Sequence, residues 1–215
     1  MHLRKTGPAG YTGPMEDHPL WQKLKEMDPK EVCRKSNAAY NSDNKTYSVP
    51  SFSTWLKVTP ADPSVSAESA PGTILLSEYG EYFSLAVPAY LVYADGRPLT
   101  GELIQPKSIS GGEIYRKGAH MLPLDRLAAR FREDAEGFLL VGRSLGGEPM
   151  QYGDASIRLY PFPHLPVYFT LWIKDEEFPE QADLFFDSSC NGEFPPDVLW
   201  GVASACTELM SAWEG

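Results

Sequence analysis

The sequence predicts an α+β fold, in which helices pack around a small, mainly antiparallel sheet as a single domain. Two observations support this prediction. Residues 199–213 carry apolar side chains on one helical face, directly after the Pro195-Pro196 pair. Before them, two runs rich in aromatic and aliphatic residues, 166–173 and 182–187, flank an acidic turn, which is typical of a β-hairpin. At 215 residues the chain is long enough for one sizeable domain, whereas two would be small.

The N-terminal part is predicted to contain short helices followed by strands. Residues 1–18 are expected to form a mobile arm, and residues 19–215 the domain. Within 20–40, apolar residues recur at helical spacing. Asp28-Pro29 supplies an N-cap and a proline at the first helical position, so this segment is one interrupted helix or two short ones. Aromatic and β-branched residues predict one or two strands over 47–58.

The central part alternates between loops and helices. Residues 59–72 are rich in Pro, Ser and Ala and predict a long surface loop within the domain. The remaining elements are a helix over 81–93 that contains Pro88, a glycine-rich extended segment over 99–118, a helix over 124–131, a second helix from about 134 to Gly146-Gly147, and a strand over 155–160.

The charge balance restricts the class of partner. The chain has 19 basic and 29 acidic residues, a net charge of −10, which argues against nucleic acid because that binding draws on Lys and Arg. Residues 171–197 contain eight carboxylates and one lysine, so we expect an acidic face that favours a cationic partner. No segment has the roughly 20 apolar residues that span a bilayer, and no signal peptide is recognised. A cytoplasmic location is therefore expected; the oligomeric state is not predicted.

Cysteine and histidine usage gives little support for a metal or redox centre. The three cysteines are isolated in sequence, which fits a reducing compartment and is too few for a four-ligand iron–sulfur cluster. Two of the four histidines lie in the expected arm, and His120 and His164 have no metal-ligand spacing. No phosphate-binding glycine loop or His-Glu-x-x-His motif is present. We therefore assign no metal site and no cofactor from the sequence.

One short motif resembles the nucleophile elbow of α/β-hydrolases. Residues 142–146 match Gly-x-Ser-x-Gly around Ser144, and Asp154 and His164 follow in the order of that fold. The elbow requires a strand before the serine, but here the preceding residues have helical periodicity. The sequence therefore favours the end of a helix at Ser144.

The acidic turn admits two interpretations. Asp175, Glu176, Glu177 and Asp187 could offer hard oxygens to Ca²⁺ or Mg²⁺, or form an acid–base pair. Neighbouring strand residues point to opposite faces, however, and the calcium-loop spacing is absent, so a solvated hairpin turn is the preferred interpretation. Asp187 closes an apolar run, where a buried carboxylate needs a partner, and Arg158 is the candidate.

Several blocks together are similar to the family known as domain of unknown function 3786. The resemblance runs from about 21 to 213 and is densest in LTGELIQPKSISGGEIY (99–115), LGGEPMQYGDASIRLYPFPHLPVYFTLW (145–172) and KDEEFPEQADLFFDSS (174–189). Two positions depart from the family pattern: Lys174 replaces an expected glycine, and His164 replaces a basic residue, often arginine. The resemblance implies an origin in anaerobic bacteria or archaea and a link to one-carbon or corrinoid metabolism. It does not extend to the four-cysteine cluster segment of some members.

The resemblance marks candidate residues without assigning them chemistry. Its motif positions include Gly153 and Phe178 as well as most of the candidates found above. The candidate functional residues are Gly112, Asp154, Arg158, His164, Asp175, Glu176, Glu177 and Asp187.

The first hypothesis is a cytoplasmic binding or accessory protein that presents its acidic face to a cofactor-bearing or basic protein partner. The alternative is a carboxylate-based enzyme, with or without a divalent metal ion, that uses Asp154, Asp175, Glu177 and Asp187. This alternative requires these side chains to lie close together.

Overall fold

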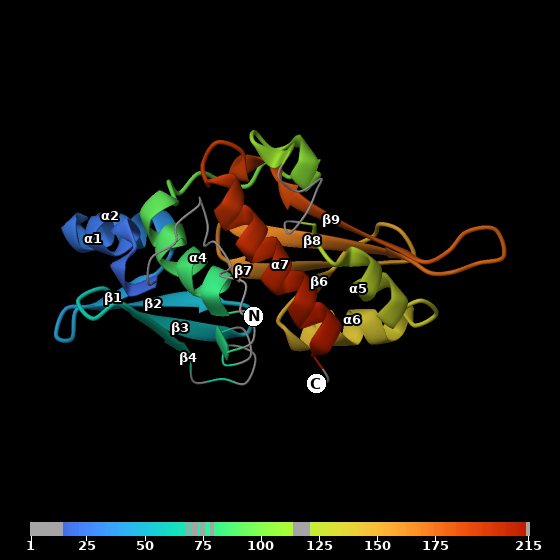
Figure 1. Cartoon of the computed structure of the whole chain (residues 1–215), viewed down its shortest axis with the longest axis horizontal. Coiled ribbons are helices and arrows are strands. Elements are labelled where there is room, and N and C mark those ends of the chain that lie inside the picture. Colours follow the sequence, from blue (N-terminus) through green and yellow to red (C-terminus); the bar gives the residue numbers. More distant parts are fainter. Residues whose placement is uncertain are drawn as a thin grey trace, which may run out of the picture.

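The computed structural model describes residues 15–67, 69, 73, 76–77, 80–113 and 121–213. Within them, two antiparallel sheets share one hydrophobic core with the helices, so the predicted α+β class is confirmed (Figure 1). The first sheet has the order β1-β2-β3-β4, formed by Ala39–Asn41, Thr46–Ser51, Thr54–Thr59 and Ser64–Ala67. The second has the order β5-β9-β8-β7-β6, formed by Leu103–Ile104, Gln181–Asp187, Leu165–Trp172, Ala155–Phe162 and Glu148–Pro149.

Two short helices precede the first sheet, which is one of the two predicted alternatives, but the helical part ends at Ser36 and the last residues of the predicted helical segment 20–40 belong to β1. Helix α1 spans Pro19–Glu26 and α2 spans Pro29–Ser36. They are separate because the Asp28 side chain accepts a hydrogen bond from the Lys30 amide at 3.0 Å and starts a new helix at the proline. Residues 1–14 of the expected arm lie outside the described residues.

Strand β4 corrects the prediction of a continuous loop over 59–72. Its residues alternate, with Val65 and Ala67 half-buried and the serines between them exposed. Val65 lies opposite Val58, and Ala67 opposite Leu56, both of which belong to the core. The alternation is only four residues long, which explains why the surrounding Pro and Ser outweighed it in the sequence.

Helices cover one face of the five-stranded sheet. They are α5 (Leu124–Arg130), α6 (Ala135–Ser144) and α7 (Pro196–Ala212), and α4 (Gly80–Tyr93) lies beside α7 (Figure 1). Beneath them, Ile157, Phe169 and Leu184 lie in register and are almost completely buried. The next row, Arg158, Tyr168 and Phe185, points to the opposite face.

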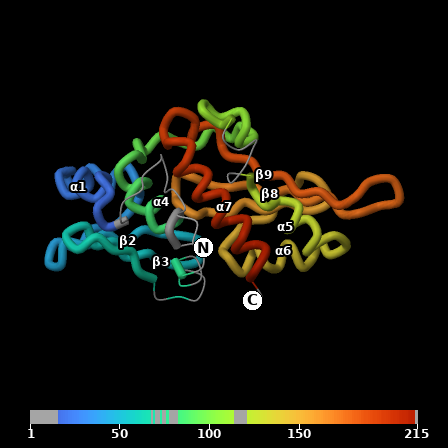
Figure 2. The backbone as a smooth tube through the Cα atoms, in the orientation of Figure 1, coloured from blue at the N-terminus to red at the C-terminus, as the bar shows by residue number. Residues whose placement is uncertain are grey.

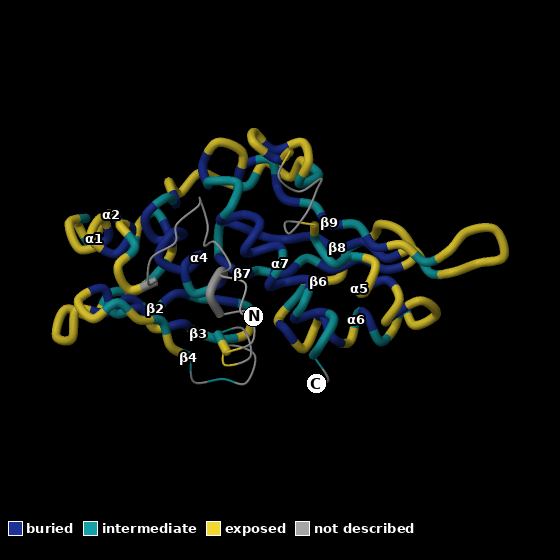
Figure 3. Tube along the Cα trace, in the orientation of Figure 1, coloured by how far each residue is buried: buried dark blue, intermediate teal, exposed yellow. Residues whose placement is uncertain are grey.

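A group of aromatic rings links the two sheets through α4. The ring of Phe52, in the turn between β2 and β3, lies 6.3 Å from that of Phe83, measured between centroids. Phe83 and Tyr90 of α4 stack on Phe162 at the end of β7, with ring centroids 5.6 and 4.5 Å away, and Phe194 stacks on Tyr90 at 5.9 Å. The Phe52 amide also donates to the Tyr160 carbonyl at 2.7 Å. Both sheets therefore contribute to one continuous core (Figure 3).

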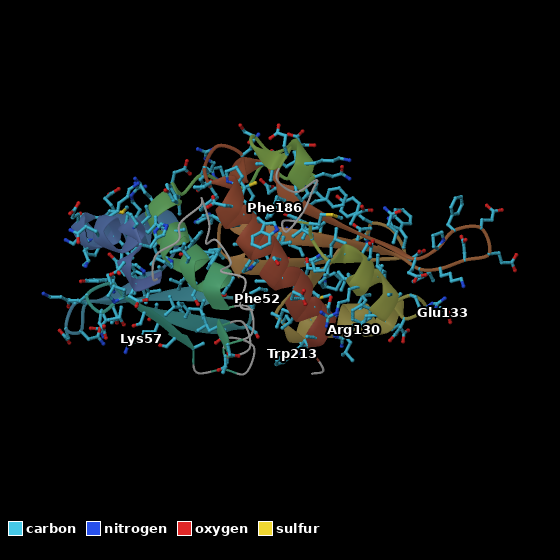
Figure 4. All side chains as sticks on the ribbon, in the orientation of Figure 1. Phe52, Lys57, Arg130, Glu133, Phe186 and Trp213 are labelled. Atoms are coloured by element: carbon cyan, nitrogen blue, oxygen red, sulfur yellow. The ribbon has the colours of Figure 1, made fainter. Side chains whose placement is uncertain are left out.

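The C-terminal end of α7 is fixed to α5. The Arg130 guanidinium donates to the carbonyl oxygens of Met210 at 3.2 Å and Trp213 at 2.5 Å (Figure 4). A cation at a helix C-terminus satisfies carbonyl groups that have no partner within the helix. None of the helices that the structure describes is long and apolar enough to cross a membrane.

Candidate functional site

The hairpin of β8 and β9 projects beyond the helices. The strands stay paired up to Trp172 and Gln181, and residues 173–180, the hairpin tip, connect them far from the centre of the molecule (Figures 1 and 2). Asp175, Glu176 and Glu177 are exposed, as the solvated-turn interpretation predicts (Figure 3). No ion pair within the described residues involves these three carboxylates.

Asp175 organises the hairpin tip. Its side chain accepts hydrogen bonds from the amides of Glu177 at 2.8 Å and Phe178 at 2.7 Å, and its own amide donates to the Phe178 carbonyl at 3.1 Å. An aspartate that binds backbone amides two and three residues ahead stabilises a turn. Asp175 is thus engaged by its own backbone, while Phe178 is held in the open with 66% of its surface exposed.

A second pair of candidates secures the base of the hairpin tip. The Asp154 side chain accepts from the Ile173 amide at 2.8 Å, and its amide donates to the Leu171 carbonyl at 3.0 Å. Gly153 has φ +58°, and a Cβ there would lie 2.7 Å from the Leu171 oxygen, so only glycine fits without displacement. Asp154 and Gly153 therefore have a positional role in holding the hairpin.

Asp187 lies at the other end of β9 and is satisfied by backbone amides. Its carboxylate accepts from the amides of Thr100, Gly101 and Ser189 at 2.9, 2.8 and 3.0 Å, and from the Thr100 hydroxyl at 3.0 Å. Burial raises the pKa of Asp187, but the hydrogen bonds from Thr100, Ser189 and Gly101 lower it more, so the pKa lies below its ordinary value. Asp187 is an ionised structural carboxylate.

The predicted pairing of Asp187 with Arg158 is wrong. Arg158 binds the Glu148 carboxylate on the neighbouring strand, and its guanidinium carbon lies 5.2 Å from the centre of the Tyr160 ring. Two backbone amides from the segment after α4 and the Ser189 amide bind Asp187 instead, and together they stabilise the charged carboxylate without a cation.

The structure does not bring the four carboxylates of the enzyme hypothesis together. Asp154 directly precedes Ala155, which pairs with Leu171 near one end of β8. Asp187 directly follows Phe186, which pairs with Val167 near the other end. The two therefore lie at opposite ends of β8, about 20 Å apart at 3.3 Å per residue. Among the described residues, no three His, Cys, Asp or Glu side chains are grouped as metal ligands would be.

The two remaining candidates lie in turns far from the hairpin tip. The His164 amide, between β7 and β8, donates to the Tyr90 hydroxyl at 3.3 Å. The Gly112 amide donates to the Ile109 carbonyl at 2.8 Å, and a Cβ at Gly112 would lie only 2.2 Å from the Pro106 oxygen. Gly112 therefore allows a close backbone approach.

Replacement of Gly112 by alanine is expected to destabilise the fold by about 1–3 kcal/mol, because the new methyl group must displace backbone. Thermal denaturation measures the effect. Ser110→Ala, at an exposed position of the same turn, is the matched control and should change the stability by less than about 0.5 kcal/mol. Equal effects of the two substitutions would contradict the close-approach explanation.

Ser144 ends α6, as predicted, and is engaged by its surroundings. Its hydroxyl donates to the Val141 carbonyl at 2.7 Å and accepts from the Trp213 indole at 2.8 Å. The residues before Ser144 form α6, whereas a nucleophile elbow requires a strand there, so the Gly-x-Ser-x-Gly match is not a nucleophile elbow.

Glu193 is a buried carboxylate that sequence reasoning did not single out. Its side chain is 1% exposed, accepts from the Asp95 amide at 3.0 Å, and lies 3.6 Å from the Arg97 Nε. Burial, together with the charge of Asp95, raises the pKa of Glu193 to about 7 despite the Asp95 amide and Arg97. In the sequence, the signal for the burial of Glu193 was its position close to Cys190 and Phe194, two residue types that are commonly buried.

The acidic segment therefore separates into three environments. Asp175, Glu176 and Glu177 of the hairpin tip are exposed, and Asp187 and Glu193 are buried. The others, Glu180, Asp183 and Asp197, are half-buried. The acidic face expected from the sequence is thus reduced to the hairpin tip and the adjoining part of β9.

Comparison with known proteins identifies the family. A model of the family described as domain of unknown function 3786 matches residues 28–208. The chain belongs to this family. The match to domain of unknown function 3786 extends from α2 into α7 and includes the whole β8–β9 hairpin. No curated protein and no solved structure matches the chain.

Proposed function

We propose that this member of domain of unknown function 3786 is a binding or accessory protein that docks a cationic partner through its hairpin tip. The observation that carries the proposal is the projecting tip itself, which combines exposed carboxylates that form no ion pair with any described residue with the exposed Phe178. The connection with one-carbon or corrinoid metabolism stays a prediction from the family resemblance.

The chemistry of the hairpin tip suits a protein partner with a basic groove. Exposed carboxylates steer a cationic surface toward the tip and increase the association rate, especially at low salt. An aromatic side chain within a charged rim can then enter a pocket and supply most of the affinity. Phe178 occupies this position between Glu177 and Pro179.

The ordered turn lowers the entropic penalty of docking. Asp175 already fixes the backbone of Glu177 and Phe178 through two hydrogen bonds. A preorganised loop loses less conformational freedom on binding than a flexible one. The tip is therefore suited to rigid insertion.

Selection from a displayed peptide library tests the proposal. Peptides that bind the wild-type protein should be basic and should bind more weakly as salt increases. The variant Glu176→Gln/Glu177→Gln/Phe178→Ala should lose at least about tenfold in affinity, since removing a central aromatic residue typically weakens an interface by more than 1 kcal/mol.

The matched control is Asp43→Asn/Asp62→Asn, which removes two exposed carboxylates from turns of the first sheet. It changes the net charge by the same amount and should keep the wild-type affinity. Selected peptides that bind the tip variant and the control equally, or no selected binder at all, would overturn the proposed function.

A further inference from the structure

Strand β9 has an outer edge that its neighbour covers only in part. β5 pairs with β9 at Asp187 and Phe186, and the pairing then ends, because the 3-10 turn Pro106–Ser108 that follows lies beside β9 without forming a strand. β9 continues along the border of the sheet toward the hairpin tip (Figure 1). Residues 181–185 therefore have a strand partner on the β8 side alone within the described part of the chain.

The ladder shows which backbone groups point outward. The Ser188 amide donates to the Glu102 carbonyl on the β5 side at 2.8 Å. In an antiparallel strand the amide and carbonyl of a residue point to the same side, and the side alternates along the strand. The amides and carbonyls of Leu184 and Ala182 consequently point away from β8, and no hydrogen bond within the described residues reaches them.

A groove lies beside this open edge. It has a volume of about 210 Å³ and runs between the end of β5 and the start of α5. Its walls are largely apolar, with one lysine and one aspartate; they include Pro106, Lys107, Met121, Leu122, Leu124 and Leu184. Met121 is 60% exposed. The groove gives space for side chains next to the unpaired backbone groups.

We propose that the outer edge of β9 at Ala182–Leu184 binds an extended segment of a partner polypeptide, which adds to the sheet as a further strand. Such strand addition uses main-chain hydrogen bonds for affinity and alternate side chains for specificity. It places the incoming strand where β5 ends, and it does not require the hairpin tip to bind anything.

The register of β9 defines the chemistry of the incoming strand. Leu184 and Ala182 lie on the face of the sheet that the helices cover. Residues of the incoming strand that pair with them therefore contact apolar groups and should be apolar. Asp183 lies on the other face and, among the residues that the structure describes, accepts a hydrogen bond from Gln181 alone, so a lysine or arginine beside it is favoured. The preferred segment therefore alternates apolar and cationic residues.

The same charges disfavour a second copy of the chain as the occupant. Two β9 edges paired with each other would bring Asp183 and Glu180 of one copy close to those of the other. Like charges across a strand pair are destabilising. A cationic segment of a different polypeptide satisfies both the backbone and the carboxylates.

The experiment uses a heptapeptide of alternating lysine and valine, and the same peptide with N-methyl groups on alternate amides. Fluorescence anisotropy should show binding of the plain peptide. The peptide methylated on the amides that point toward β9 should bind with an affinity at least about tenfold lower, because methylation removes hydrogen bonds and keeps the charge. Amide exchange should show new protection at Ala182 and Leu184.

Ala182→Pro supplies the protein-side test. Proline is tolerated on an edge strand where the amide points outward, so the fold should persist while one donor for the peptide is lost. The tip variant Glu176→Gln/Glu177→Gln/Phe178→Ala should bind the peptide like wild type, which separates this site from the proposed docking tip.

Three results would overturn the inference. The plain and methylated peptides could bind equally, which would indicate charge attraction alone, or the plain peptide could fail to bind at millimolar concentration. Sedimentation could also show a dimer that Ala182→Pro dissolves, which would make a second copy the occupant.

Discussion

Replacement of Asp187 by alanine is expected to lower the free energy of unfolding by about 3–5 kcal/mol. The carboxylate is the acceptor for the amides of Thr100, Gly101 and Ser189. Its removal leaves three donors without their acceptor; Ser189 is buried, whereas Thr100 and Gly101 are exposed residues, and each donor that stays unsatisfied destabilises the folded state by about 1–3 kcal/mol. The loss is smaller than the sum because water can enter the space.

Urea denaturation of Asp187→Ala and wild type measures this effect. Asp183→Ala, two residues earlier on the same strand, is the matched control, because its side chain is half-buried and bonds only to Gln181. We expect a change below about 1 kcal/mol for the control. A loss below this value for Asp187→Ala would show that water replaces the carboxylate.

The pH dependence of the same contact has a defined sign. The pKa of Asp187 is lowered in the folded state, so its contribution is fully present above the ordinary aspartate pKa. It is lost as the pH falls through the folded-state pKa, which lies below 3.8. The stability difference between wild type and Asp187→Ala should therefore shrink at the acidic end, below about pH 4.

Glu193 should make the stability fall as the pH rises from about 5 to about 8. Its folded-state pKa is about 7, raised from 4.5, so the folded protein holds a proton that the unfolded chain releases in this range. The stabilisation is complete below pH 4.5 and is lost as the pH passes 7. A shift of this size corresponds to about 3 kcal/mol.

Glu193→Gln should remove this part of the pH dependence, because glutamine stays neutral. Arg97, Asp95, Cys190 and Tyr90 surround the carboxylate; the Asp95 amide and Arg97 favour its charged form, whereas burial and the Asp95 carboxylate oppose it. Thermal melts at pH 5, 6.5 and 8 compare wild type, Glu193→Gln and the exposed control Glu177→Gln. Parallel pH profiles for wild type and Glu193→Gln would refute the assignment.

The elements of the fold could be predicted wherever periodicity was long. Helix α7 and the strands of the β8–β9 hairpin carry strong patterns over their whole length, and proline or aspartate marks the starts of α2 and α7. Strand β4 was missed because four alternating residues are too few to outweigh a loop-like composition.

The candidate site was harder to predict because its contacts are distant in sequence and involve the backbone. The partners of Asp187 are amides at Thr100 and Gly101, which carry no side-chain signal for a carboxylate. The burial of Glu193 depends on how the turn before α7 meets the end of α4. The open edge of β9 exists because β5 is only two residues long.

The stacked rings of Phe83, Phe162, Tyr90 and Phe194 also bear on how the molecule responds to mechanical load. A pull on the hairpin would travel along β8 into β7 and arrive at Phe162, which is connected to the first sheet through Phe83 of α4 and Phe52. The protein should therefore resist bending at this stack of rings, and tension applied to the hairpin at one end should be transmitted to the four-stranded sheet at the other.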